Sequence, residues 1–369
     1  MARVFIAGGG VIGLSIAWRA SQAGFDVTVA DPDPGQGASH AAAGMLTPVS
    51  EAAYTEKELF GLGAASLERY PAFAAELTAA TGLPTGFRLT GTLQVGYDHD
   101  DLAVIDELRM LQDSLGVPGQ WLTGRECRRL EPMLDPSVRG GLLVAADGSV
   151  DPRQLTRALL AAVDQAGVQL VRQPVTRIDG RTARLADGTT AEADWVVLAA
   201  GWNSGSIDGL GPGAVPPVRP VKGQILRLRG PAGFLNRSVR GVVRGSSVYL
   251  VPRADGELVV GATQEELGTD TRVTAGGLWE LLRDARALVP GLTELEFTEA
   301  VARLRPGTPD NGPILGPGPA EGLVLATGHF RNGVLLTPVT ADAIVGYLTD
   351  GQLPEVAAHF TIDRFGRAA

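Results

Sequence analysis

The chain has 369 residues, of which 44% are hydrophobic and 20% charged, and its formal net charge is −9. This length is typical of about two domains, and the composition is that of a globular protein with a sizeable core. The acidic balance excludes the extended basic surface that binding to nucleic acid or to an anionic membrane would need.

Cysteine usage and hydropathy narrow the setting further. Cys127 is the single cysteine, so the chain can form no internal disulfide and contains no CxxC motif. No stretch reaches the roughly 18 uncharged apolar residues of a membrane helix. The short apolar run at the N-terminus breaks at once into glycines, so we interpret it as a strand and not as a signal peptide. We therefore expect a cytoplasmic protein that does not bind a membrane.

The first 31 residues predict a strand, a glycine turn, a helix and a second strand. Residues 4–7 are apolar, and residues 11–23 carry apolar side chains at helical spacing. Gly24 is placed to end that helix, and residues 27–30 are again apolar. This order is typical of the βαβ unit of a parallel sheet.

Further along, the chain alternates between helical and extended patterns. Residues 32–43 are rich in small residues and turn formers, and we interpret them as a loop. Beyond this loop the patterns predict helices at 55–81, 100–115 and 152–165, and strands at 91–97, 168–171 and 195–200.

Residues 216–304 differ from the rest, because short apolar runs are separated there by glycine turns. These runs predict strands of an antiparallel sheet at 224–228, 247–251 and 257–261. The chain then returns to a buried strand at 322–327, a second glycine-flanked turn at 328–333 and a helix at 335–348.

The opening glycine turn carries the strongest chemical signal. Gly8, Gly10 and Gly13 satisfy the pattern G-x-G-x-x-G between a strand and a helix, and Asp31 closes the second strand. Such a turn lets the backbone approach a pyrophosphate, which the helix N-terminus attracts, while the acidic residue binds the ribose. The turn therefore predicts a dinucleotide site, and a glycine turn without a ligand is the less favoured alternative.

Three features favour FAD over NAD as this dinucleotide. The motif lies at residue 8 with no catalytic domain before it, and a second strand–glycine–helix element returns at Gly328. The intervening chain is long enough for a separate substrate domain. We expect the opening turn to bind the pyrophosphate and the distant turn at 328–333 to bind the flavin end.

Several segments carry a family resemblance that runs nearly end to end. Besides the opening turn they are residues 41–46, 150–152, 248–253, 304–308 and 328–333, of which the last two are the most specific. On these segments the chain resembles the glycine oxidase and D-amino-acid oxidase family of FAD-dependent oxidoreductases, and most of all its thiamine-biosynthesis type.

The resemblance implies a fold of α/β plus α+β class. A discontinuous Rossmann-like FAD-binding domain would comprise residues 1–85, 145–215 and 306–369. A substrate-binding domain built on an antiparallel sheet, of residues 86–144 and 216–305, would be inserted into it.

The resemblance also implies roles at the substrate site. Arg305 matches the family's carboxylate-binding arginine, whose planar guanidinium can form two parallel hydrogen bonds that lysine cannot copy; a structural ion pair is the alternative. Tyr249 would line the pocket and donate its hydroxyl to the same carboxylate, although a half-buried core tyrosine is also common. Arg331 matches a position that touches substrate. We predict these three as catalytic residues, with Met45 and Gln264 completing the substrate-binding set.

The cofactor site implied by the resemblance draws on both ends of the chain. Its predicted residues are Gly8, Gly10, Val11, Ile12, Gly13, Asp31, Ser39, Ala43, Gly44, Met45, Val175, Gly201, His329, Phe330, Arg331, Asn332, Gly333, Val334 and Leu335. The helix after this last run would direct its N-terminal dipole at the flavin, and His329 would cap or pack. Cys127 lies far from the segment where sarcosine oxidases attach flavin, so we expect non-covalent FAD.

The implied reaction is oxidative deamination of glycine by oxygen, with release of hydrogen peroxide. Sarcosine or another small D-amino acid is the second substrate, and a dehydrogenase with another electron acceptor or a flavin-binding redox sensor are further alternatives. We expect the amine to arrive neutral, since the sequence nominates no catalytic carboxylate. The family often forms tetramers, which makes a homotetramer one expectation.

Three positions keep alternatives open. Gln264 and Ser247 depart from the family pattern, which has methionine and histidine there, so the substrate preference stays open. Lys222 is interpreted either as a lysine near the flavin that assists oxygen or as a solvated surface lysine.

Overall fold

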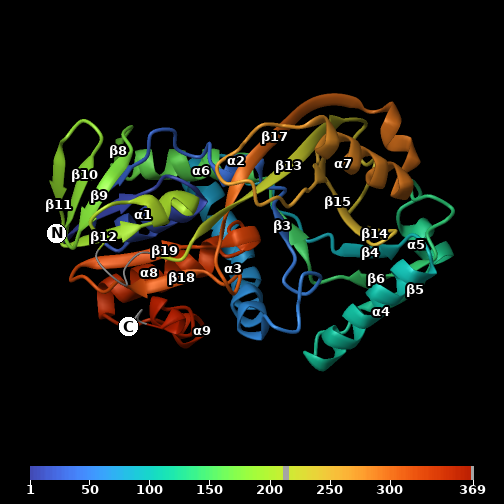
Figure 1. Cartoon of the computed structure of the whole chain (residues 1–369), viewed down its shortest axis with the longest axis horizontal. Helices are drawn as coiled ribbons and strands as arrows, with labels where there is room; N and C mark the ends of the chain where they lie inside the picture. Colours follow the sequence, from blue (N-terminus) through green and yellow to red (C-terminus); the bar gives the residue numbers. More distant parts are fainter. Residues whose placement is uncertain (211–215, 367–369) are drawn as a thin grey trace.

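Two β-sheets with their covering helices make up most of the molecule. The computed structural model describes residues 1–210 and 216–366. Figure 1 shows the sheet that contains the N-terminal strand on the left and a second sheet on the right. The long strands β13 (Arg219–Arg229) and β17 (Glu296–Gly307) of the second sheet extend toward the first. In the described parts of the chain, none of the helices combines the length and apolarity needed to span a bilayer.

The first sheet has six strands in the order β18-β19-β12-β1-β2-β8. Its strands are parallel except for the edge strand β18, which pairs antiparallel with β19. Their bounds are β18 (Ile314–Pro317), β19 (Leu323–Thr327), β12 (Trp195–Leu198), β1 (Arg3–Ala7), β2 (Asp26–Ala30) and β8 (Gln169–Val171). The predicted βαβ unit is therefore present, with α1 (Val11–Gln22) joining β1 to β2.

Both faces of this sheet are covered, which explains why its strands are apolar throughout. Val4 and Ile6 of β1 pack into one core cluster, and Phe5 and Ala7 pack into another on the opposite face. The first cluster is covered by α1, α3 (Lys57–Thr81), α6 (Pro152–Gln165) and α8 (Thr337–Asp350). The second lies under a small sheet of β9 (Val175–Asp179), β10 (Thr182–Leu185) and β11 (Thr190–Glu192).

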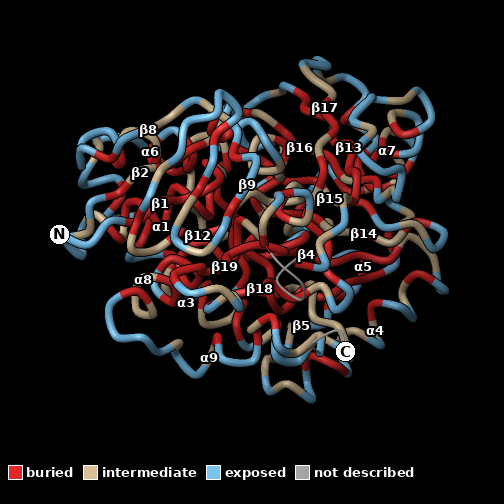
Figure 2. The backbone as a smooth tube through the Cα atoms, turned by 60° about the vertical axis from the view of Figure 1, so that its left-hand side comes forward, coloured by how far each residue is buried: buried red, intermediate tan, exposed pale blue. Residues whose placement is uncertain are grey.

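The second large sheet has eight strands in the order β17-β13-β16-β15-β14-β4-β6-β5. Pairing is antiparallel as predicted, except that β14 and β4 are parallel. The bounds not yet given are β16 (Glu257–Gly261), β15 (Ser246–Pro252), β14 (Ser238–Val243), β4 (Thr92–Gly96), β6 (Gly140–Val144) and β5 (Gln120–Thr123). Helix α7 (Ala275–Leu288) packs on it over a third core cluster. Figure 2 shows buried backbone running through both large sheets and exposed backbone in the outer loops.

Short elements complete the fold. They are α2 (Ala38–Ala41), β3 (Met45–Leu46), α4 (His99–Ser114), α5 (Gly124–Leu130), β7 (Gly148–Ser149), α9 (Glu355–Ala358), and the 3-10 turns η1 (Gly201–Ser206), η2 (Pro290–Glu294), η3 (Phe330–Asn332) and η4 (Ile362–Phe365). The prediction of an uninterrupted loop at 32–43 is wrong at α2, a single helical turn too short to produce a periodic pattern. The predicted domain division stays a prediction; its boundary at 305/306 falls inside β17.

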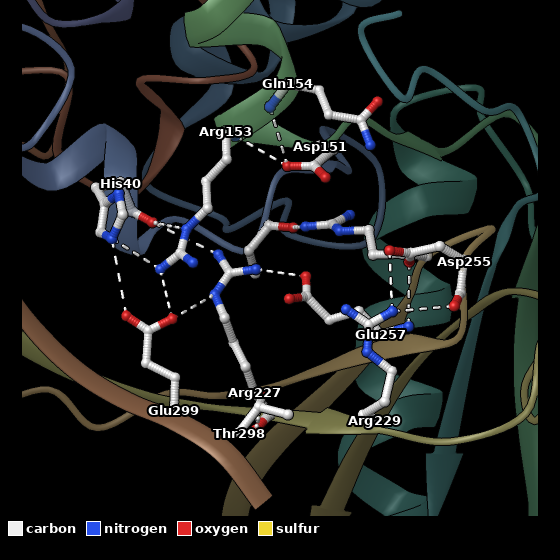
Figure 3. Close-up of polar contacts among 12 residues, drawn as sticks. His40, Asp151, Arg153, Gln154, Arg227, Arg229, Asp255, Glu257, Thr298 and Glu299 are labelled. Atoms are coloured by element: carbon white, nitrogen blue, oxygen red, sulfur yellow. Dashed lines mark hydrogen bonds and ion pairs between the residues drawn. The ribbon is translucent and has the colours of Figure 1, made fainter. Parts of the chain in front are cut away.

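A buried ion network joins the two halves of the molecule (Figure 3). Arg227 of β13, whose side chain is 1% exposed, bonds Glu257 of β16 at 2.5 Å and faces Glu299 of β17 at 3.7 Å. Glu299 in turn bonds Arg153 of α6 at 2.8 Å, and Arg153 donates to the carbonyl of His40 in α2. The eight-stranded sheet is thus connected by an ion pair to α6, and through Arg153 by a hydrogen bond to α2.

Replacing Arg227 should reveal how strongly this network contributes to stability. Arg227→Ala leaves two carboxylates near a buried site without their shared partner, so we expect a loss of about 3–5 kcal/mol in the free energy of unfolding. Arg229→Ala on the same strand removes a half-exposed pair with Asp255 and should cost less than about 1 kcal/mol. Urea unfolding of both variants measures the difference, and equal small losses would contradict a structural role for the network.

Candidate active site

A large cavity lies between the two sheets. Its volume is about 1010 Å³, at the upper end of the roughly 300–1,000 Å³ usual for small-molecule sites. It extends from the glycine turn after β1, past the segment at residues 41–45, to β13, β15 and β17 of the eight-stranded sheet. A cavity of this size can hold a large cofactor together with a small substrate.

The glycine turn at one end is built for close backbone approach. Gly8 has a φ of +117°, and a Cβ atom added to it would lie 2.3 Å from the carbonyl oxygen of Ala199 in the loop after β12. A Cβ atom on Gly13 would lie 1.9 Å from the carbonyl oxygen of Gly8. Gly8 is therefore required by the close approach of the backbone after β12, and Gly13 by the packing of α1 on the turn.

Gly10 differs, because the protein itself leaves space beside it. A Cβ atom there would meet only Ser39 Oγ, at 3.4 Å, and Gly10 is the N-cap of α1 and lines the cavity. The start of α1 thus borders a space that the chain does not fill, where the helix dipole attracts an anion. A pyrophosphate fits this cradle.

Polar groups surround the same end of the cavity. The carboxylate of Asp31 accepts hydrogen bonds from the amides of Gly9 at 2.7 Å and Asp33 at 2.8 Å. A carboxylate offers about four acceptor sites, so it can still accept from a ligand hydroxyl. Ser39 Oγ accepts from the amide of Val11 at 3.2 Å.

The structure brings most of the predicted cofactor-binding residues to the cavity wall, although they come from distant parts of the chain. Those lining it are Gly8, Gly10, Val11, Ile12, Asp31, Ser39, Ala43, Gly44, Met45, Val175, Gly201, His329, Phe330, Arg331, Gly333 and Val334. Gly13, Asn332 and Leu335 lie outside the lining: Gly13 packs on the Gly8 carbonyl, and the other two are buried, Asn332 within the return turn and Leu335 just after it. Direct contacts of these residues with a cofactor stay predictions.

His329 is a neutral packing residue in the return turn. It is 3% exposed, its Nε2 lies 3.1 Å from Thr340 Oγ1 of α8, and burial lowers the pKa of its imidazole to about 3. Helix α8 begins at Thr337, two residues later than the predicted start at 335.

At the opposite end of the cavity Arg305 and Tyr249 lie together. The Arg305 guanidinium donates from Nη1 to the carbonyl of Thr263 at 3.1 Å. Tyr249 lies opposite Gly261 in the ladder between β15 and β16. The side chains of Arg305 and Tyr249 both line the cavity. Burial raises the pKa of Tyr249 against the opposing effect of Arg305, so its hydroxyl keeps its proton and can donate.

Two glycines of the sheet make room for this pair. A Cβ atom on Gly223 would lie 2.3 Å from Arg305 Nη2, and one on Gly261 would lie 2.4 Å from Tyr249 Oη. Sequence reasoning missed both positions. The available signal was a glycine within or at the end of a strand, which indicates that another group approaches closely.

Charged residues surround Arg331 near the substrate end. Arg331 pairs with Glu56 at 2.5 Å and faces Glu51 at 3.8 Å. Glu51 also forms a short ion pair with Arg240 of β14. Arg331, Glu51 and Arg240 all line the cavity, so a carboxylate is present where the sequence nominated none. Glu51 was missed because it lies in an irregular segment that matches no motif.

The remaining predicted pocket positions also reach the cavity. Met45 is half-buried, with its sulfur 3.9 Å from Arg240 Nη1. Gln264 and Ser247 are exposed and line the cavity wall. The two departures from the family pattern therefore lie on the cavity wall, and their effect on substrate preference stays a prediction.

One of the two interpretations of Lys222 is wrong, and its proximity to the flavin stays a prediction. Its side chain is 0% exposed, which excludes a solvated surface lysine. It does not line the cavity; its Nζ lies 3.2 Å from Asp270 and 3.5 Å from Glu265. Because its backbone carbonyl also accepts from Arg305 at 3.4 Å, Lys222 belongs to the support of that arginine.

A glycine turn on a parallel sheet, joined by one cavity to an arginine on an antiparallel sheet, is the arrangement of a flavin-dependent oxidoreductase. The family model described as FAD dependent oxidoreductase (DAO) matches residues 3–346. The chain belongs to this family, and its cofactor is FAD. Cys127 is buried in the core of the eight-stranded sheet and does not line the cavity, so a thioether link through it is excluded.

Individual relatives agree with this assignment. The chain is 37% identical over 370 residues to the bifunctional protein ThiO/ThiG of Synechocystis sp., covering 98% of this chain and 54% of that protein. It is 34% identical to the glycine oxidase of Geobacillus kaustophilus, covering 91% of this chain and 90% of that protein. The crystal structure of glycine oxidase from Geobacillus kaustophilus superposes with a TM-score of 0.91 at 33% identity, covering 99% of both chains. The chain spans about half the length of the ThiO/ThiG relatives.

The glycine turn allows a matched pair of substitutions. Gly10→Ala should leave the apoprotein's unfolding midpoint nearly unchanged and weaken FAD binding at least tenfold, because the added methyl occupies the space left for phosphate. Gly13→Ala should lower the apoprotein's stability by about 1–3 kcal/mol or more, because its methyl meets backbone. Thermal unfolding and FAD titration separate the two effects. Tight FAD binding by a stable Gly10→Ala protein would argue against the cradle.

Proposed function

We propose that this chain is a glycine oxidase, which deaminates glycine oxidatively to glyoxylate, ammonia and hydrogen peroxide through an imine. The observation that carries the proposal is the Arg305 guanidinium at the cavity wall beside the Tyr249 hydroxyl. Relatives named glycine oxidase that cover nearly the whole chain support it. Sarcosine and small D-amino acids are the expected further substrates.

The residues at the substrate end divide the work of positioning. Arg305 would hold the substrate carboxylate with two parallel hydrogen bonds, and Tyr249 would donate a third from a hydroxyl that stays protonated. Hydrogen bonds from these two side chains would leave the substrate Cα with little freedom. Such positioning supplies much of the rate enhancement in reactions of this kind. FAD, when bound, supplies the hydride acceptor.

Three parts of the proposal rest on the resemblance and on the relatives' names. Oxygen is proposed as the electron acceptor, with a dehydrogenase acting on D-amino acids or sarcosine as the alternative. The name ThiO/ThiG supports a role in supplying the imine for the thiazole branch of thiamine biosynthesis. A homotetramer in the cytoplasm completes the proposal.

Peroxide release is the direct test of this function. The purified FAD-loaded protein is mixed with glycine, sarcosine, D-alanine or D-proline, and peroxide is measured with a coupled peroxidase. Glycine should give the highest kcat/KM. Reduction of an artificial dye without peroxide would instead identify a dehydrogenase, and no turnover of any of the four would refute the proposal.

Substitution of Arg305 tests the carboxylate site. Because hydrogen bonds to charged groups contribute about 1.5–3 kcal/mol, Arg305→Ala should raise the KM for glycine about 10- to 100-fold or more. Arg305→Lys should recover part of this loss, and Tyr249→Phe should cost no more than about tenfold. Steady-state kinetics on all three variants gives the comparison; an unchanged KM in Arg305→Ala would remove this residue from the substrate site.

A further inference from the structure

A buried carboxylic acid lies directly behind the cavity wall. Asp147, in the turn between β6 and β7, is 0% exposed. Its Oδ2 accepts a short hydrogen bond from the hydroxyl of Ser50. Ser50 lines the cavity, whereas Asp147 does not. The serine hydroxyl therefore stands between this carboxyl group and the ligand space.

The surroundings of Asp147 do not satisfy an ionised carboxylate. Its Oδ1 has no hydrogen-bond partner among the residues that the structure describes. Burial raises its pKa to about 7, although the hydroxyls of Ser50 and Thr92 and the charge of Arg240 lower it, and the charge of Glu51 raises it further. Asp147 can therefore gain or lose a proton near neutral pH, which an exposed aspartate cannot do.

Ser50 lies at the substrate end of the cavity. It is followed in the chain by Glu51, which pairs with Arg240. Arg240 is opposite Tyr249 in the ladder between β14 and β15, and Tyr249 adjoins Arg305. The path from Asp147 thus leads to the residues proposed to hold the substrate carboxylate, and away from the glycine turn.

Glycine near neutral pH carries an ammonium group, yet hydride can leave Cα only when the nitrogen lone pair is free. One proton must therefore be taken up between binding and oxidation. We propose that Asp147 accepts this proton through the hydroxyl of Ser50. The inference rests on the proposed function, and it replaces the expectation that the amine must arrive neutral.

The transfer balances in protons and electrons. The ammonium N–H gives its proton to Ser50 Oγ while the Ser50 hydroxyl proton passes to Asp147 Oδ2, which leaves a neutral amine and a neutral carboxylic acid. Oxidation of the amine then removes a hydride from Cα. Reduction of oxygen to hydrogen peroxide consumes two electrons and two protons. The hydride supplies the electrons and one proton, and Asp147 returns the other by the same route.

Other groups near the substrate end are less suited to accept a proton. The Glu51 carboxylate is already engaged, because it forms an ion pair with Arg240 and faces Arg331 at 3.8 Å. Burial raises the pKa of Tyr249, so it holds its own proton. The His329 imidazole, with its lowered pKa, is neutral and occupied with Thr340.

The pH dependence of glycine oxidation tests the proposal. In the wild-type protein, kcat/KM should fall below an apparent pKa near 7, because a protonated Asp147 cannot accept. Asp147→Asn should lower kcat/KM at pH 7 by about 100-fold. The gap should narrow as the pH rises and the free amine of glycine becomes abundant. Ser50→Ala keeps the carboxyl group but breaks the path. Its pH profile of kcat/KM should be displaced to higher pH in the same way as that of Asp147→Asn.

Binding of glycolate distinguishes proton transfer from a purely structural role of Asp147. A structural role would change the dissociation constant of glycolate in Asp147→Asn. Glycolate has a hydroxyl group in place of the ammonium group, so its binding requires no proton transfer. Its dissociation constant, followed by the absorbance of bound FAD, should be equal in wild type and Asp147→Asn at every pH. Asp284→Asn, a buried carboxylate of α7 outside the cavity lining, is the matched control and should keep the wild-type pH profile.

Each outcome decides between readings. An unchanged pH profile in both Asp147→Asn and Ser50→Ala overturns the proposal, as does a uniform loss at all pH values with weakened glycolate binding. Displacement of the acid limb in Glu51→Gln, but not in Asp147→Asn, assigns the proton to Glu51 instead. Failure of the wild-type protein to oxidise glycine refutes the proposed function, whereas a wild-type protein that oxidises glycine isolates the inference about Asp147.

Discussion

The buried guanidinium of Arg253 fixes the wall on which both ends of the cavity depend. From the end of β15 it donates to the carbonyl of Val150 at 3.0 Å and to the carbonyl of Ala43 through a shorter bond. Burial lowers its pKa to about 10, so the side chain stays charged at neutral pH. These bonds attach the segment at residues 41–45, which lines the cavity, to the eight-stranded sheet. They hold the cofactor end of the cavity against the sheet that carries the substrate end.

The same segment is also held from the other layer. The Gly44 carbonyl accepts from the Val150 amide at 2.8 Å, and a Cβ atom on Gly44 would lie 2.0 Å from the Val150 carbonyl oxygen. Hydrogen bonds to a charged donor are among the stronger ones in proteins, and unpaired buried carbonyls are costly. The positions of Arg253 and Gly44 are therefore coupled. This coupling gives a physical reason for the arginine and the glycine in the two segments, 248–253 and 41–46, that carry the family resemblance.

Local patterns predicted the elements whose cause is local. The helix expected at 152–165 is α6, because Asp151 caps it by accepting from the amides of Arg153 and Gln154 and because Pro152 opens its first turn. The glycine turn after β1 was predicted equally well, since Gly13 is required by a contact within the βαβ unit itself, although the close contact of Gly8 is with Ala199 after β12. Arg305 and Tyr249 came from the resemblance, and the structure brings both to the cavity.

What the sequence could not predict depends on pairing between distant residues. Lys222 was read as a surface or flavin-side lysine because nothing nearby in the chain announces Asp270 as its partner. Glu51, Arg240 and Asp147 come from three separate segments. Their ion pair and their effects on the pKa of Asp147 exist only because the fold brings them together. A carboxyl group in a turn, such as Asp147, is typically solvated, and only its burial behind Ser50 changes its chemistry.

The charges at the substrate end also explain how the site can treat the two ends of a zwitterion differently. Arg305 contacts backbone carbonyls of Thr263 and Lys222, which are neutral acceptors, so its positive charge remains available to a carboxylate. Arg331 and Arg240, by contrast, are paired with Glu56 and Glu51. An amino acid that places its carboxylate on Arg305 therefore meets no further uncompensated cation from these two arginines, and its ammonium group is not repelled. Such a field would orient a substrate bound in this way, which is the form of catalysis that a preorganised cavity can supply.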